Sequence, residues 1–98
     1  MRIRLTPRAL AEAKRIKTWW RQNRRAAPHL FEQELKAALA RIRATPDLGI
    51  AYQPGRFEVP VRRVLLPRTQ HHVYYAVEQR VVVVLCVWGA QHGHDPVL

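Results

Sequence analysis

Residues 81–88, VVVVLCVW, form the longest uninterrupted apolar run of the chain. Successive valines favour a β-strand, because side chains branched at Cβ pack well on a pleated surface. The run is too short for a membrane-spanning helix, which needs about 20 apolar residues. A strand that is apolar on both faces indicates a central position in a sheet, or an edge that a partner covers.

Two neighbouring segments also have strand patterns. Residues 61–66, VRRVLL, end before Pro67, and residues 71–77, HHVYYAV, alternate their side chains between two faces. The short link between Val77 and Val81 predicts a hairpin. Its turn type stays open, since the link contains no Asn-Gly or Asp-Gly pair.

The start of the chain predicts a strand at residues 2–5, RIRL, followed by a helix. Thr6 is a suitable N-cap and Pro7 a suitable first helical residue, because proline has no N–H to leave unpaired. One face of this helix collects Ala9, Ala13, Ile16 and Trp20, with Trp19 beside it. A basic stripe next to that face consists of Lys14, Lys17, Arg21 and Arg24.

A second helix is expected with Pro28 at its first position. Its apolar residues recur at helical spacing: Phe31, Leu35, Ala38, Leu39 and Ile42. The helical pattern ends at Thr45, before Pro46, and an irregular connection follows up to residue 60.

Together the elements predict one domain over residues 1–98, of the α+β class and in the order β-α-α-β-β-β. The N-terminal strand and the helical hairpin would pack on one face of a small twisted antiparallel sheet. The other face is expected to stay open. Arg62, His72 and Tyr74 would then line a working surface or docking site.

The positive charge is concentrated in the first half of the chain. Residues 1–43 hold 12 Lys and Arg and 3 acidic residues, a net +9, whereas residues 44–98 hold 5 and 4, a net +1, which gives the total of +10. A charge this large predicts an anionic partner, either a nucleic acid or an acidic protein. The single cysteine, Cys86, excludes an internal disulfide, and the start MRIRL has no apolar signal segment, so a reducing cytoplasm is expected.

The histidines do not form a convincing metal site. His71 and His72 are adjacent on a strand and point to opposite faces, and His92 with His94 supplies only two ligands. No metal or cofactor is therefore expected. RNA cleavage, which needs a base, an acid and cations for the phosphate, stays open through Arg62, Arg63, His72 and His92, although arginines on the solvent face of a strand also occur without any activity. Cys86 is an unpromising nucleophile, because burial raises the pKa of a thiol.

Four segments resemble the RelE/ParE superfamily, the toxins of bacterial type II toxin–antitoxin systems. They are LTPRALAEAKRIKTWW (5–20), FEQELKAALARIRATPDLG (31–49), VRRVLLPRTQHHVYYAVEQRVVVVLCVWGA (61–90) and GHDPVL (93–98). The resemblance implies a helical hairpin on a small sheet. It also implies one of two activities: RelE-like toxins cleave messenger RNA in the ribosome, and ParE-like toxins block DNA gyrase. Both are neutralised by a co-expressed antitoxin whose C-terminal segment wraps the toxin.

The ParE-like branch is favoured. His72 stands where the nuclease branch commonly has an arginine, and the tail lacks a terminal aromatic or basic catalytic group, while Arg63 matches both branches. The expected function is gyrase inhibition, growth inhibition and plasmid stabilisation by protein contact rather than by catalysis. The alternatives are a ribosome-dependent endonuclease that uses Arg63, His72 and His92, and a basic nucleic-acid-binding module.

The resemblance also implies two contact surfaces. The expected target-binding residues are Arg62, Arg63, Arg68, His92 and His94. The antitoxin is expected in a hetero-oligomer with this chain, on the apolar surface between hairpin and sheet, at Lys14, Lys17, Arg21, Arg24, Leu35 and Leu39.

Overall fold

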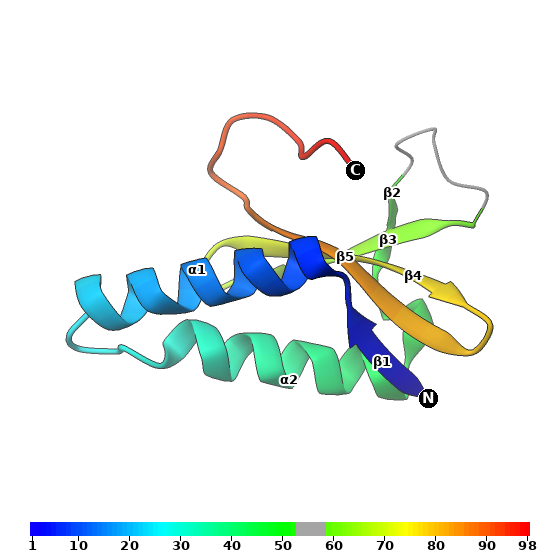
Figure 1. Ribbon diagram of the computed structural model, residues 1–98, viewed down its shortest axis with the longest axis horizontal. Helices are drawn as coiled ribbons and strands as arrows, with labels where there is room; N and C mark the ends of the chain where they lie inside the picture. Colours follow the sequence, from blue (N-terminus) through cyan, green and yellow to red (C-terminus); the bar gives the residue numbers. More distant parts are fainter. Residues whose placement is uncertain (53–58) are drawn as a thin grey trace.

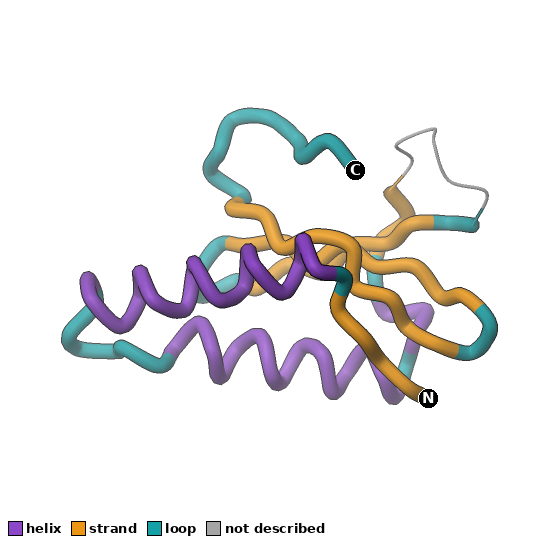
Figure 2. The backbone as a smooth tube through the Cα atoms, in the orientation of Figure 1, coloured by secondary structure: helices purple, strands orange, loops and turns teal. Residues whose placement is uncertain are grey.

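The structure, a computed structural model, describes residues 1–52 and 59–98. Two helices lie side by side against one face of a five-stranded sheet, and the C-terminal tail, residues 90–98, curves back on the other side (Figures 1 and 2). The elements are β1 (Arg2–Leu5), α1 (Pro7–Asn23), α2 (Leu30–Ala44), the short 3-10 helix η1 (Pro46–Leu48), β2 (Ile50–Tyr52), β3 (Val61–Leu66), β4 (His71–Glu78) and β5 (Val81–Gly89). The α+β class is confirmed.

The start of α1 follows the predicted cap. The Ala9 amide donates to the Thr6 hydroxyl at 3.1 Å, and Pro7 is the first helical residue. The predicted start of α2 is wrong by two positions. Its first helical hydrogen bond runs from the Gln33 amide to the carbonyl of His29, so Pro28 lies in the preceding turn. No described helix is long and apolar enough to cross a membrane.

The sheet has the strand order β1-β5-β4-β3-β2. The valine-rich strand β5 is an interior strand between β1 and β4, in agreement with one of the two interpretations of its sequence. The sheet is mixed rather than purely antiparallel, because β1 pairs with β5 in parallel. The connection expected to be irregular contains η1 and the short edge strand β2, which pairs with β3. The β4–β5 hairpin closes through Gln79 and Arg80, both with positive φ (50° and 64°), which defines the open turn type as I′.

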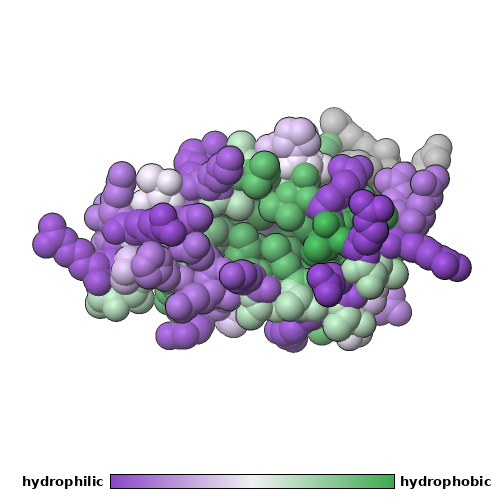
Figure 3. All heavy atoms as spheres, turned by 60° about the horizontal axis from the view of Figure 1, so that its bottom comes forward, coloured by the Kyte–Doolittle hydropathy of each residue, from purple (hydrophilic) through white to green (hydrophobic). Residues whose placement is uncertain are grey.

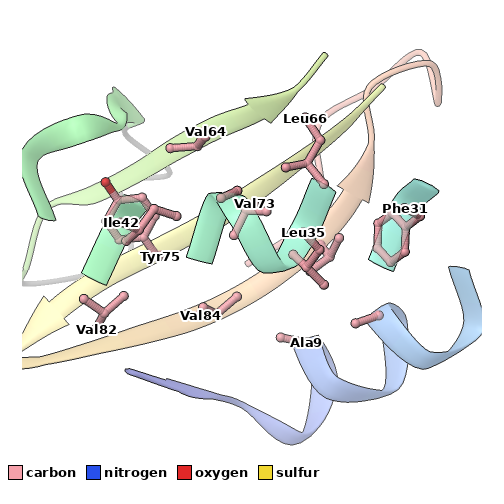
Figure 4. Packing of buried hydrophobic residues seen from close by; sticks show 13 residues of the cluster. Ala9, Phe31, Leu35, Ile42, Val64, Leu66, Val73, Tyr75, Val82 and Val84 are labelled. Carbon is pink, nitrogen blue, oxygen red and sulfur yellow. The ribbon is translucent and has the colours of Figure 1, made fainter. Parts of the chain in front are cut away.

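The main core lies between the helices and the sheet (Figure 4). Aliphatic side chains of α2, such as Leu35 and Ile42, meet Val82 and Val84 of β5 there. Tyr75 brings a polar group into this core, and its hydroxyl donates to the Pro46 carbonyl at 2.7 Å and accepts from the Gly49 amide at 2.8 Å. These two bonds attach η1 to the sheet.

The opposite face of the sheet is not open, so that expectation is wrong. A second set of buried side chains lies outside the main core: Val61, Tyr74, Ala76, Val83 and Cys86. Tyr74, which was expected at an open surface, is only 1% exposed. The C-terminal tail folds back on this side of the sheet (Figure 1), and its Pro96 is buried as well.

Candidate target-binding site

Besides the backbone hydrogen bond from the Ala90 amide to the Gln70 carbonyl, three side-chain contacts hold the tail against the sheet and α1. The Trp88 indole N–H donates to the carbonyl of His94 at 3.0 Å. Arg63 lies 3.8 Å from the carboxylate of Asp95. Near the chain end, the guanidinium of Arg8 donates to the carbonyl of Val97. The tail is therefore tied to β5, to β3 and to the first turn of α1.

Beneath the tail, Arg63 is the centre of a polar and aromatic cluster. Its guanidinium lies 3.5 Å from the Tyr74 hydroxyl and 5.5 Å from the ring centre of Tyr52. The two tyrosine rings meet edge to face at 5.0 Å, and His72 lies 6.0 Å from Tyr74 on the same face. Register explains this gathering, because Arg63 pairs with Tyr74 across β3 and β4, and paired residues share a face.

A cavity of about 290 Å³ opens between this cluster and the tail. It is lined by His72, Tyr74, Trp88, Gly89, Ala90, Gly93, His94 and Asp95. Burial lowers the pKa of His72, and the neighbouring Arg63 charge lowers it further, so the imidazole is neutral near pH 7. Burial also raises the pKa of Tyr74, which keeps its hydroxyl protonated. The cavity thus offers neutral hydrogen-bonding groups beside one cation and one carboxylate.

Only part of the expected target-binding set lies at this cavity. His94 lines it, and Arg63 lies beside it in contact with Tyr74 and Asp95, but the grouping of Arg62 with His72 and Tyr74 is wrong. Arg62 pairs with Tyr75 on the helix side, where its guanidinium donates to the carbonyl of Gly49 at 2.8 Å. Arg62 therefore holds the chain between η1 and β2 and does not face the tail.

Arg68 and His92 lie elsewhere. The side chain of Arg68 is exposed in the β3–β4 turn, and its amide donates to Glu34 at 2.8 Å. The ring of His92 lies 4.5 Å from that of Trp88 but lines a different cavity, beside Trp20. Of the three residues of the nuclease alternative, His72 and His92 consequently line different cavities, and Arg63 lines neither.

The basic stripe of α1 is divided in a similar way. Lys17 and Arg21 contact Glu32 of α2 at 3.5 and 3.0 Å. These contacts join the helices, and the hydrogen bond from Arg21 is the main cause that lowers the pKa of Glu32. Among the described residues, Lys14 and Arg24 have no carboxylate within 4.0 Å. Arg24 instead lies over the Trp19 ring at 4.8 Å.

A family model described as the ParE toxin of the type II toxin–antitoxin system parDE matches residues 3–92. The chain belongs to the ParE toxin family. A solved structure described as "Chromosomal ParDE TA system from P. aeruginosa" has the same fold at a TM-score of 0.65 and 16% identity, and the match covers 93% of this chain and 97% of that chain. No curated protein matches the sequence.

Two expected antitoxin anchors of this ParE-family chain belong to its own interior. Leu35 is only 9% exposed and is part of the main core, and Leu39 is partly buried against that core. Leu35 is thus not available to a partner in this conformation. Figure 3 nevertheless shows hydrophobic residues gathered on the face that looks out from the bottom of Figure 1, with hydrophilic side chains around them. Ile3 and Leu5 of β1 are apolar residues that are only partly buried against the main core.

Three residues of this candidate site were not identified from the sequence: Tyr52, Trp88 and Asp95. Each contacts Arg63 or the tail. Asp95 carried the clearest signal, since it is the only carboxylate after Glu78 and stands next to a histidine. Its partner on β3 lies 32 positions earlier in the chain and could not be identified from local spacing.

Cys86 and the histidines are the remaining reactive groups. Burial, followed by the nearby Glu12 charge, raises the pKa of Cys86 to about 12, so its thiolate is not populated at neutral pH. Within residues 1–52 and 59–98 no group of three or more His, Cys, Asp or Glu side chains gathers as metal ligands do.

Proposed function

We propose that this chain is the toxin of a type II toxin–antitoxin pair that inhibits DNA gyrase by direct contact. Membership of the ParE toxin family supports the proposal. A cognate antitoxin would hold the toxin inactive in a hetero-oligomer, and the similar solved structure from P. aeruginosa is of such a ParDE system. The toxin would act in the cytoplasm and arrest growth there, which is the basis of plasmid stabilisation.

The distribution of Arg63, His72 and His92 carries this proposal against the nuclease alternative. Acid–base cleavage of RNA needs a base, an acid and a phosphate-binding cation around one reacting centre. His92 lines the cavity beside Trp20, whereas His72 lines the cavity beneath the tail. Arg63 is also already engaged with Asp95 and Tyr74. Binding to a protein surface does not require these three residues to lie around one centre.

Arg63, Trp88 and His94 are the proposed target contacts. Tryptophan and arginine are enriched among residues that dominate binding energy at protein interfaces. The ion pair between Arg63 and Asp95 has a partly exposed guanidinium and a more exposed carboxylate, so it is weak enough to be exchanged for an acidic group of the target. The proposed antitoxin contacts are Lys14 and Arg24, with the apolar face of Figure 3 beside the helices.

Gyrase supercoiling and ribosome-dependent RNA cleavage are the assays that separate the two toxin activities. We expect the purified chain to inhibit supercoiling and to leave ribosome-bound messenger RNA intact. Arg63→Ala should weaken inhibition at least about tenfold, equivalent to 1.4 kcal/mol of binding energy. Arg80→Ala, in the exposed β4–β5 turn, is the matched control and should change little. RNA cleavage that disappears in His72→Ala would overturn the proposal.

A further inference from the structure

A cavity of about 460 Å³ lies at the C-terminal end of α1, away from the Arg63 cluster. It is lined by Ile16, Trp19, Trp20, Arg24, Thr69, Gln70, His71, Gly89, Gln91 and His92. The lining comes from α1, from the β3–β4 turn and β4, and from β5 and the tail. A volume in this range can hold a drug-sized ligand or a large side chain.

The described lining of the cavity combines apolar side chains with one positive charge. Ile16 and Trp20 form an apolar floor that packs against the main core, and Trp19 is 46% exposed at the mouth. Arg24 lies 4.8 Å from the Trp19 ring and 5.7 Å from the Trp20 ring. None of the described carboxylates lines the cavity. The site therefore disfavours a cation and favours an apolar group with a negative charge beside it.

Gly89 permits the polar side of the cavity to form. A Cβ added at Gly89 would lie 2.9 Å from Cδ2 of His92, closer than real Cβ contacts allow. His71 is fixed on this side by a 3.2 Å contact between its Nδ1 and the Thr69 hydroxyl, and burial lowers its pKa. The imidazole is thus a neutral hydrogen-bonding group rather than a second cation.

We infer that this cavity receives one large apolar side chain of the antitoxin, with a neighbouring carboxylate of the antitoxin bound to Arg24. The inference rests on the proposed function, because it names a contact of the proposed antitoxin. Charge complementarity selects an acidic peptide as the occupant. Within residues 1–52 and 59–98, Arg24 is the one arginine or lysine in the lining, and it has no carboxylate within 4.0 Å. Because the floor of the cavity is apolar, the occupant must also bring an apolar group, which a simple anion lacks.

Two variants test the cavity without removing core side chains. Arg24→Ala removes the proposed partner of the carboxylate, and Gln91→Trp fills the cavity from an exposed tail position. Arg25→Ala is the matched control, since Arg25 is exposed, adjacent and outside the lining. The probe is the antitoxin encoded by the reading frame next to the gene, titrated by isothermal calorimetry. Thermal unfolding of each variant checks that the fold is retained.

We expect Arg24→Ala and Gln91→Trp each to weaken antitoxin binding at least about tenfold, and Arg25→Ala to change it less than about twofold. The indole N–H resonances of Trp19 and Trp20 should shift when the antitoxin binds. Equal losses in Arg24→Ala and Arg25→Ala would mean that only the overall charge matters, and would overturn the assignment of the cavity. Binding of adenosine monophosphate in the cavity, together with unchanged antitoxin affinity in Gln91→Trp, would also overturn this assignment. Failure of the antitoxin to bind the unmodified chain would overturn the proposed antitoxin partnership together with this inference.

Discussion

The two faces of the sheet are both buried, but they are covered by different means. On one face, two helices bring aliphatic side chains against β3, β4 and β5. On the other face, a tail of nine residues is held by an indole hydrogen bond, an exposed ion pair, a contact to Arg8 and one backbone hydrogen bond, and it buries only Pro96. Apolar burial contributes far more stability than such surface polar contacts. The tail-covered face is accordingly the one that can open locally while the domain stays folded, which is consistent with the target contacts proposed there.

The largest effect should come from the helix-covered face. Phe31 is 1% exposed and lies against the ring of His71 at 5.1 Å. Phe31→Ala would leave a cavity there, and we expect the free energy of unfolding to fall by about 3–5 kcal/mol. Urea denaturation followed by circular dichroism measures it. Leu65→Ala, at a partly exposed position on the tail side, is the control and should cost much less.

The adjacent tyrosines of β4 make a matched pair across the two faces. The Tyr75 hydroxyl has two short hydrogen bonds, and its loss would leave the buried Gly49 amide without its acceptor. We expect Tyr75→Phe to destabilise the fold by about 1–3 kcal/mol. The Tyr74 hydroxyl has one long contact to Arg63, so Tyr74→Phe should cost about 1 kcal/mol or less. Equal losses in the two variants would contradict the comparison of the faces.

The strand that carries these tyrosines also shows what the sequence could predict and what it could not. Periodicity predicted the helices and the strand spans, since burial of one face forces that pattern on the chain. It could not assign Arg62 and Arg63 to their faces, because VRRVLL is apolar on both: Val61 is buried on the tail side, and Val64 and Leu66 on the helix side. The assignment depends on the pairing of β3 with β4, which is a long-range property.

The tail could not be predicted for a related reason. Its sequence, QHGHDPVL, has no helical or strand period, so nothing local indicates that Asp95 returns to β3 or that Pro96 becomes buried. Gly93, with φ of 81°, adopts the left-handed conformation that helps the chain to turn back. The two cavities both involve this returning segment, which is why His92 and His94 line different cavities although they are two positions apart.

Deletion of residues 94–98 measures the strength of the tail cover. It removes the acceptor of the Trp88 indole, the carboxylate partner of Arg63, the carbonyl that accepts from Arg8, and the buried Pro96. Two hydrogen bonds, a surface ion pair and one buried proline together stabilise by about 2–3 kcal/mol, so the shortened chain should stay folded. Amide exchange at Tyr74 and Cys86 should become faster, while that at Ile42 changes little. A loss of stability as large as that of Phe31→Ala would show that the tail is part of the main core.

The smallest expected effect compares His71 with His72, which point to opposite faces. Burial is the largest cause that lowers the pKa of each, below the usual value of about 6.5. As the pH falls through 6.5, the unfolded chain therefore binds protons before the folded chain does, and stability decreases. Urea unfolding at pH 7.5, 6.5 and 5.5 should show this decrease in a window where most carboxylates remain ionised. His71→Gln should reduce the slope more than His72→Gln, because His71 lies deeper, against the helices. An unfolding midpoint that rises on acidification would contradict both assignments, and a larger effect from His72 would mean that the tail excludes water better than the helix-side cavity does.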